Sequence, residues 1–278
     1  MNNINYPCLW FDNNAKTAAE FYTSVFPNSK IFQDTGMVCS FDLMGTKLIG
    51  LNGGPKYKVS KAVSYFVYCG KEVDIDELYA RLKEGGEVLF PLDKYDWSPR
   101  YAWVQDKFGV NWQLDIEPIN HKQKIVPCLL FSKTDVGRVK EAMEYYLSCF
   151  QNSRALMEYP FPPLAGKAEG ALLFAQIKLG DFILNLMSGR PDQGDEFSPG
   201  NSLVIECQNQ AEIDLYWEAL GKEGRYDMCG WLQDKFGHSW QVVPAVLPRL
   251  MAHPVKGPRV VQAFLKMQKF DIAALERA

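Results

Sequence analysis

The apolar positions of the first fifty residues change spacing as the chain advances. A short, mainly apolar run from Tyr6 to Phe11 predicts a strand. The next apolar residues recur every three or four positions, as on one face of a helix: Ala15, Ala18, Ala19, Tyr22 and Phe26. Three further strands follow, with Gly45 at the turn between the last two. This stretch therefore predicts a βαβββ module.

The same order of elements recurs along the chain. The runs "AVSYFVYC" and "NSLVIEC" each open another round of strand, helix and strands, with helices expected at Val73–Lys83 and Ala211–Gly221. A strand at Ile125–Phe131, followed by apolar residues at helical spacing, begins one more. The pattern predicts an α+β protein in which four βαβββ modules form two curled mixed β-sheets, with helices on the outside.

Short matching stretches show that the chain carries a duplication. "DKFGVNWQL" at Asp106–Leu114 returns as "DKFGHSWQV" at Asp234–Val242, 128 residues later. "PCL" recurs at an offset of 120, "SVFPNSK" is echoed by "SCFQNSR" at 124, and "GTKLIGLNGGP" by "GDFILNLMSGRP" at 135. The order of the matches never changes while the spacing varies, as duplication followed by loop insertion and deletion would leave it.

The last thirty residues depart from the repeat. They have a helical pattern, with Pro258 suited to a helix start and Asp271 suited to cap a short helix at Ile272–Arg277. We expect this tail to pack on its own chain, against the second half, or on a partner subunit, because so short a helix is marginal in water by itself. The predicted domains are residues 1–120, residues 121–250 and a helical tail at 251–278.

Composition narrows the class of protein. The chain has 278 residues, 47% of them hydrophobic, and Lys plus Arg (30) nearly balance Asp plus Glu (33). The sequence has no basic stripe of the kind that binds nucleic acid. No apolar stretch is long enough to span a bilayer, and the N-terminus does not resemble a secretory signal. The seven cysteines include no CxxC pair, which favours free thiols in a reducing cytoplasm.

Several stretches carry a resemblance to a known family: "PCLWFDNNAKTAAEFYTSVFPNSKI", "LNGGP", "CGWLQDKFGHSWQVVP" and "RVVQAFLKMQKFDIAALERA". The chain resembles the PhnB-like branch, often labelled 3-demethylubiquinone-9 3-methyltransferase, of the vicinal-oxygen-chelate superfamily. That superfamily is also called glyoxalase/bleomycin-resistance/dioxygenase. Because many relatives have one half and pair as dimers, the resemblance implies a covalent pseudo-dimer here. Methyl transfer is not expected, because no GxGxxG or GxGxG turn for S-adenosylmethionine is present.

In this superfamily the enzymes chelate a divalent metal with His, Glu or Gln on cleft-facing strand positions, so strand alternation predicts the candidate site. On the fourth strand we expect Ile49 and Leu51 to pack inward. The residues that we expect to line a cleft and contact a ligand are Cys8, Trp10, Asn52, Ser64, Phe66, Trp103, Gln113, Cys128, Asn185, Ser202, Glu206, Cys229, Trp231 and Gln241.

These candidates form a poor set of metal ligands. Glu206 is the one cleft-side carboxylate among them, and amides and hydroxyls bind divalent metals weakly. The three histidines, His121, His238 and His253, are expected at the surface or in turns. Cys229 is a candidate reactive thiol, although a packed thiol is the simpler interpretation, since no histidine lies near it in sequence. We therefore expect no metal and no cofactor.

The repeated Asp-Lys-Phe-Gly motif is interpreted as mainly structural. Its Asp can bond the backbone of a turn, its Gly can adopt positive φ, and the following Trp can anchor the last strand. Only Gln113 and Gln241 would then reach the cleft. Signatures of P-loop hydrolases, zinc proteases and α/β-hydrolases are missing.

Three hypotheses for function remain open. The first is a protein that binds a small organic molecule without a metal, because aromatic cleft candidates occur without metal ligands. The second is a metal-dependent lyase or isomerase of the glyoxalase type that uses Gln113 or Gln241, Glu206 and Cys8. The third is an assembly module whose tail mediates dimer contacts. The expected partner is a small molecule rather than nucleic acid or a membrane, and the chain would act as a monomeric pseudo-dimer or a homodimer.

Overall fold

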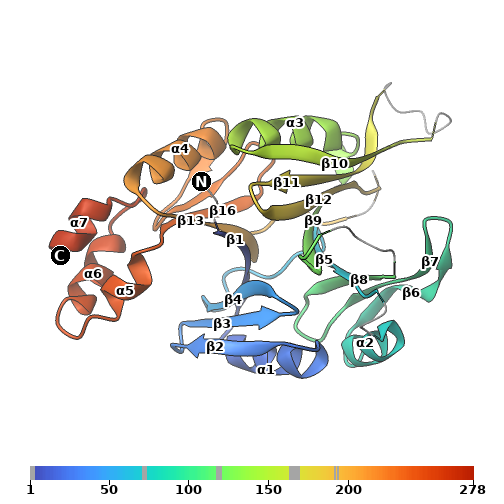
Figure 1. Cartoon of the computed structure of the whole chain (residues 1–278), viewed down its shortest axis with the longest axis horizontal. Helices are drawn as coiled ribbons and strands as arrows, with labels where there is room; N and C mark the ends of the chain where they lie inside the picture. The colour runs from blue at the N-terminus through green and yellow to red at the C-terminus, as the bar shows by residue number, and fades with distance from the viewer. Residues whose placement is uncertain (1–3, 71–73, 117–120, 163–169, 191, 193) are drawn as a thin grey trace.

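The computed structural model confirms four βαβββ modules and two mixed sheets (Figure 1). It describes residues 4–70, 74–116, 121–162, 170–190, 192 and 194–278. Within each module the first and last strands pair in parallel, and the three later strands form an antiparallel meander. In the part of the chain that the structure describes, no helix is long and apolar enough to cross a bilayer.

The elements of the first two modules follow the predicted order. Module 1 contains β1 (Ile4–Phe11), α1 (Ala15–Val25), β2 (Lys30–Asp34), β3 (Val38–Leu43) and β4 (Thr46–Asn52). Module 2 contains β5 (Val63–Tyr68), α2 (Ile75–Leu82), β6 (Glu87–Tyr95), β7 (Ser98–Gln105) and β8 (Asn111–Asp115).

The last two modules repeat this order. Module 3 contains β9 (Ile125–Phe131), a short 3-10 turn (Lys133–Asp135), α3 (Val139–Cys149), β10 (Ser153–Pro160), β11 (Leu172–Leu179) and β12 (Phe182–Ser188). Module 4 contains β13 (Asn201–Cys207), α4 (Gln210–Gly221), β14 (Arg225–Tyr226), β15 (Trp231–Gln233) and β16 (Ser239–Pro244).

Each sheet combines modules from both sides of residue 120. Sheet A has the order β14-β15-β16-β13-β1-β4-β3-β2 and joins modules 1 and 4, whereas sheet B has the order β10-β11-β12-β9-β5-β8-β7-β6 and joins modules 2 and 3. The seams are antiparallel pairs, β1 with β13 and β5 with β9. The first 120 residues therefore contribute half of each sheet. That each half also forms a domain by itself stays a prediction.

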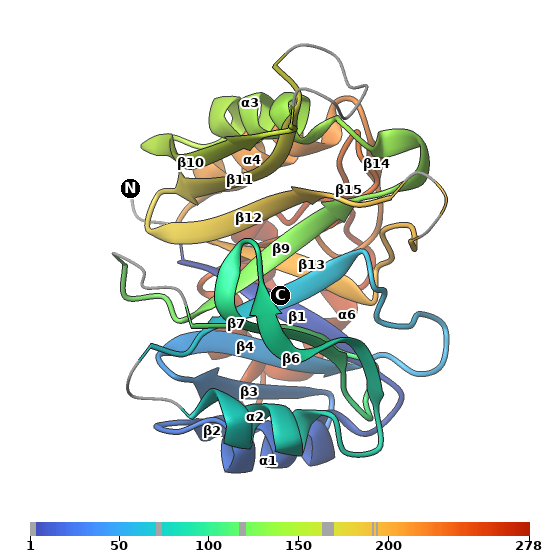
Figure 2. The same cartoon turned by 90° about the vertical axis from the view of Figure 1, so that its right-hand side faces the viewer.

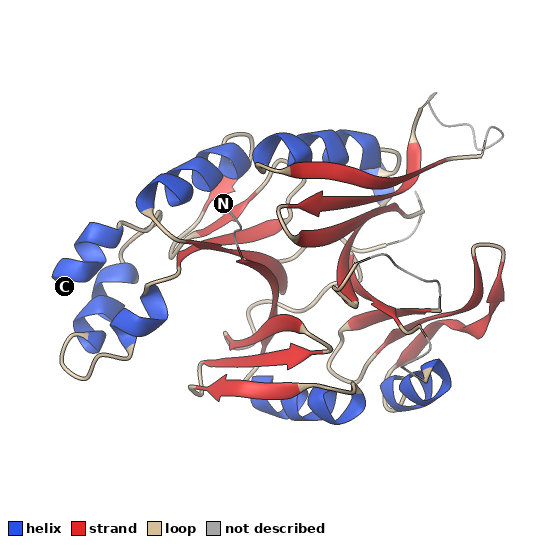
Figure 3. Ribbon diagram, in the orientation of Figure 1, coloured by secondary structure: helices blue, strands red, loops and turns tan. Residues whose placement is uncertain are grey.

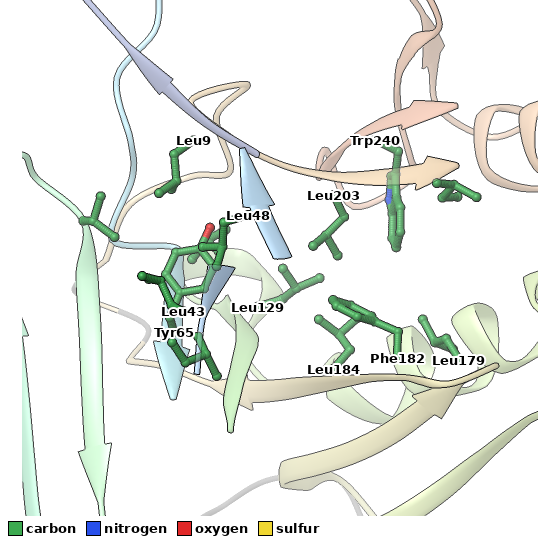
Figure 4. Packing of buried hydrophobic residues seen from close by; sticks show 14 of the residues in the cluster. Leu9, Leu43, Leu48, Tyr65, Leu129, Leu179, Phe182, Leu184, Leu203 and Trp240 are labelled. Carbon is green, nitrogen blue, oxygen red and sulfur yellow. The ribbon is translucent and has the colours of Figure 1, made fainter. Parts of the chain in front are cut away.

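The two sheets share one hydrophobic core. Figure 4 shows Leu9, Leu203 and Trp240 of sheet A opposite Leu129 and Leu184 of sheet B, and all of these side chains are buried. The helices close this core, α1 beside α2 at one side and α3 beside α4 at the other (Figures 1 and 3). We call the core side of each sheet its inner face, and the side turned away from the other sheet its outer face.

The repeated motif is anchored by a buried carboxylate. Asp234 accepts hydrogen bonds from the Trp240 indole and the Tyr146 hydroxyl, both at 2.8 Å, and from the backbone N–H groups of Phe236 and His238. Asp106 accepts the equivalent indole bond from Trp112 at 2.8 Å. The Asp turn and the tryptophan anchor that the sequence predicted are thus one hydrogen-bonded unit.

The tail packs on module 4, as expected. It forms α5 (Leu247–Met251), α6 (Gly257–Phe264), which has Pro258 in its first turn, and α7 (Ile272–Arg277), which Asp271 caps by accepting from the Ala274 N–H. The Cys229 and Gly230 N–H groups donate to the Met267 and Gln268 carbonyls. Phe270 is buried beside Gly230. The tail therefore covers the position where module 4 has only short β14 and β15 strands.

Candidate functional sites on the outer faces of the sheets

Each outer face has a buried cysteine, serine and glutamine at equivalent positions. On sheet A, Cys8 lies opposite Ser202, and the Gln241 amide donates to the Ser202 hydroxyl at 3.0 Å. On sheet B, Cys128 lies opposite Ser64, and the Gln113 amide donates to the Ser64 hydroxyl at 2.7 Å. These triads bring together six of the residues predicted from the sequence. The duplication thus extends to the chemistry of the two faces.

Both thiols of the triads are held in the neutral form. Burial raises the pKa of Cys8 to about 11, although hydrogen bonds from Gln241 and Ser202 act in the opposite direction. Burial raises the pKa of Cys128 further. A thiol is nucleophilic and ligates metals as the thiolate, so neither cysteine is poised for these roles at neutral pH.

Sheet B adds a second layer of neutral polar groups. The Tyr101 hydroxyl donates to the Gln113 side-chain oxygen. The Tyr68 hydroxyl accepts from Asn185 at 3.2 Å and from Gln176 at 3.3 Å, and Gln176 also donates to Asn185 at 3.0 Å. Burial raises the pKa of both tyrosines, so they stay protonated. The outer face of sheet B is therefore polar but largely uncharged.

Aromatic rings cover much of the same face. Phe66 and Tyr68 lie with Tyr101 in one buried cluster, against which Trp103 and Phe90 pack. The Phe90 and Trp103 rings are stacked with their centroids 6.0 Å apart. Planar apolar surface beside fixed polar groups is the usual composition of a small-molecule site.

Sheet A has charged groups where sheet B has neutral ones. Lys47 forms an ion pair with Glu206 at 3.1 Å, and its ammonium lies 3.8 Å from the centre of the Tyr6 ring. Glu206 pairs with Ile4, four residues along β1 from Cys8, which is ~13 Å at the rise of a strand. Glu206 is thus paired with a lysine and lies away from the triad, rather than beside Cys8.

Three aromatic residues gather near one end of the outer face of sheet A. Trp10 lies edge-on to Trp231 at 6.0 Å and to Tyr57 at 5.1 Å. The Trp10 indole donates to the Gly54 carbonyl at 2.7 Å. Both predicted tryptophans therefore belong to this face.

Asn52 and Cys229 lie elsewhere than expected. The Asn52 side chain accepts from the Ala15 N–H at the start of α1, and Ile49 and Leu51 take the outer face instead. The strand carries apolar residues on both faces, and Gly50 rather than a large residue meets Ala15, so the alternation was assigned one residue out of step. Cys229 lies under the tail, where its thiol donates to the Phe264 carbonyl.

Of the three histidines, His238 differs from expectation because it is buried. His238 sits in a turn, as predicted, but is buried, and neither ring nitrogen has a partner. His121 is partly buried and lies edge-on to Tyr68 at 6.0 Å. His253 is exposed and accepts from the backbone of Val255 and Lys256.

A family model described as 3-demethylubiquinone-9 3-methyltransferase matches residues 3–115 and again residues 123–243. The chain belongs to this family. This is the family label that the resemblance to the PhnB-like branch indicated from the sequence. The double match covers most of the chain and coincides with the two pairs of modules.

Two solved structures illustrate what the PhnB-like chain is similar to. A putative 3-demethylubiquinone-9 3-methyltransferase, the PhnB protein from Bacillus cereus, is 30% identical over 40% of this chain and 96% of its own, with a TM-score of 0.36. Glyoxalase I from Zea mays is 12% identical, covers 88% of this chain and 94% of its own, and has a TM-score of 0.56, which shows the shared fold. Among curated proteins no match was found.

The triads of this PhnB-like protein do not fit a divalent metal. Each offers a protonated thiol, a hydroxyl and an amide, all weak ligands compared with imidazole, thiolate or carboxylate. Across the described residues, no three or more His, Cys, Asp or Glu side chains lie close enough to hold a metal ion. The set of Gln, Glu206 and Cys8 proposed for a metal enzyme is not assembled.

Sequence analysis missed several residues of these faces. Tyr68 lies two positions after Phe66, and Tyr101 two positions before Trp103, so strand alternation alone would have placed both on the outer face. Lys47 could have been found in the same way once the register of β4 was known. Gln176 lies between Ala175 and Ile177, which pack in the inner core, so alternation along β11 would have placed it on the outer face as well.

Proposed function

We propose that this PhnB-like protein binds a small organic molecule on the outer face of at least one of its sheets and does so without a divalent metal. The observation that carries the proposal is the pair of triads, which put neutral, hydrogen-bonded side chains at the centre of each outer face. Aromatic rings beside them supply the apolar contact area that a small ligand needs. We do not assign methyl transfer, because the sheets are mixed and the sequence has no glycine-rich turn for S-adenosylmethionine.

We also propose that the chain acts in the cytoplasm as a monomeric pseudo-dimer or a homodimer. All seven cysteines are free, which suits a reducing compartment. Both seams between modules are already formed within one chain, so neither sheet needs a partner subunit for completion. We propose domain boundaries near residues 120 and 250, because the two copies of the sequence repeat meet and end there.

Metal analysis separates this proposal from a glyoxalase-type lyase or isomerase. We expect the protein, purified without chelators, to contain much less than one equivalent of Zn, Ni, Mn or Fe per chain by elemental analysis. The Gln113→Ala and Gln241→Ala variants should leave that content unchanged. About one metal per outer face, lost in these two variants, would establish the metal-dependent alternative instead.

A further inference from the structure

We infer that only the outer face of sheet B is the ligand site and that its ligand is an uncharged, planar aromatic molecule, one per chain. This inference rests on the proposed function and adds the face, the number of sites and the class of ligand. Four observations support it: the lengths of the edge hairpins, the aromatic residues that they carry, buried polar atoms without partners, and the charge on the two faces.

The two largest length differences between the two halves of the chain both fall on sheet B. The β6–β7 hairpin runs from Glu87 to Gln105, whereas its counterpart in module 4 runs only from Arg225 to Gln233. β10 and β11 have eight residues each, against five and six in β2 and β3. β6 and β10 are the two edges of sheet B, so the longer hairpins border one face from both sides (Figure 2).

The longer β6–β7 hairpin adds aromatic surface to this face. Tyr95 and Trp97 stack with their ring centroids 4.9 Å apart, and both lie edge-on to Tyr101 at 5.6 Å. Trp97 is 57% exposed, so part of this stack stays accessible to a ligand. Module 4 has no equivalent residues, because its hairpin is short and the tail covers that position.

The same face contains polar atoms that lack a partner. The Trp103 indole N–H and both ring nitrogens of His121 are buried and make no hydrogen bond. Burial lowers the pKa of His121, so its imidazole is neutral at pH 7 and offers one donor and one acceptor. A ligand carbonyl can accept from the Trp103 N–H, and a ligand N–H or O–H group can donate to the His121 imidazole.

The charge on the two faces points to the same ligand. The groups around Trp103 and Tyr68 are mainly phenols, amides and hydroxyls. On sheet A the corresponding space contains the Lys47–Glu206 ion pair, and the Trp10 indole is already bonded. An uncharged planar molecule therefore matches sheet B better than sheet A.

The duplication provides a matched pair of test variants. Trp103 pairs with Gln113 on sheet B, as Trp231 pairs with Gln241 on sheet A. We would titrate the full chain by calorimetry with three neutral lactams, 2-quinolone, 4-quinolone and isoquinolin-1-one, and with the anion naphthalene-2-carboxylate and the cation N-methylquinolinium. Trp103→Phe keeps an aromatic ring, although a smaller one, and removes the N–H donor. His121→Phe is a second variant, and thermal melting checks that each one folds.

We expect at least one lactam to bind at one site per chain, and more tightly than either ion. Trp103→Phe or His121→Phe should weaken binding roughly 5–10-fold, the value of one hydrogen bond, whereas Trp231→Phe should leave it unchanged. Two equal sites, or a loss confined to Trp231→Phe, would overturn the choice of sheet B while leaving small-molecule binding intact. Tighter binding of an ion, or no lactam bound at about 1 mM, would overturn the ligand class.

Discussion

The buried imidazole of His238 should make the stability of this protein depend on pH. The side chain is 1% exposed and packs edge-on against Phe197 and Trp240 at 5.4 Å, and neither ring nitrogen has a partner. Burial lowers its pKa to about 3. At the equivalent position of the first half, the sequence has Val110, which is also fully buried. His238→Val therefore replaces the imidazole with the residue that the other half already uses.

The magnitude follows from the difference in pKa between the two states. In the unfolded chain His238 should titrate near ~6.5, so below that pH the unfolded state binds a proton that the folded state does not accept. The part of the free energy of unfolding that depends on His238 is therefore fully present above pH 6.5. It is lost as the pH falls toward the folded pKa of about 3. Between pH 7.5 and pH 5 this loss amounts to about 2 kcal/mol.

Asp234 titrates nearby but in the opposite sense. Burial raises its pKa to about 6, so its contribution to stability falls as the pH rises from its unfolded value to about 6. Because the wild type and His238→Val both keep Asp234, the difference between their free energies of unfolding removes most of this effect. Urea unfolding at pH 7.5, 6 and 5 should show His238→Val gaining stability over the wild type by about 2 kcal/mol more at pH 5 than at pH 7.5.

The reciprocal change, Val110→His, is the control. It should destabilise the protein and make the free energy of unfolding fall between pH 7.5 and pH 5, as His238 does in the wild type. A gap between wild type and His238→Val that stays constant with pH would refute the reasoning, as would a His238 ring that titrates near 6.5 in the folded protein.

Two further perturbations test the anchors of module 4. Asp234→Ala leaves one indole, one hydroxyl and two backbone donors unpaired, so urea unfolding should show a loss of about 3–5 kcal/mol, whereas Asp227→Ala, which breaks an exposed pair with Arg225, should cost less than ~1 kcal/mol. Deleting residues 256–278 removes buried Phe270 and Leu275 and should lower the melting temperature or expose a surface that binds hydrophobic dye. Unchanged melting, oligomeric state and dye binding would show that the tail is dispensable.

The modules could be predicted because apolar residues are spaced differently in strands and in helices. The repeat supported each assignment a second time, since both halves show the same order of elements. It did not fix which modules share a sheet, because Pro7–Leu9 and Pro127–Leu129 look alike and either could pair with β5 or with β13. That the candidate site residues bind a ligand stays a prediction, but strand alternation placed them on the correct face wherever one face of a strand is polar, as at Ser64 and Gln113. It failed at Asn52, where both faces are apolar and a contact with α1 decides the register.

Which modules share a sheet determines when each sheet can form while the chain is being synthesised. Modules 2 and 3 are neighbours in sequence, so sheet B can close as soon as the middle of the chain has left the ribosome. β1 must wait for β13, about 150 residues after the end of β4. At typical translation rates this delay is ~10–30 s, during which module 1 presents an unpaired strand edge. The nascent chain is therefore most exposed to mispairing and to chaperones at its N-terminal strand.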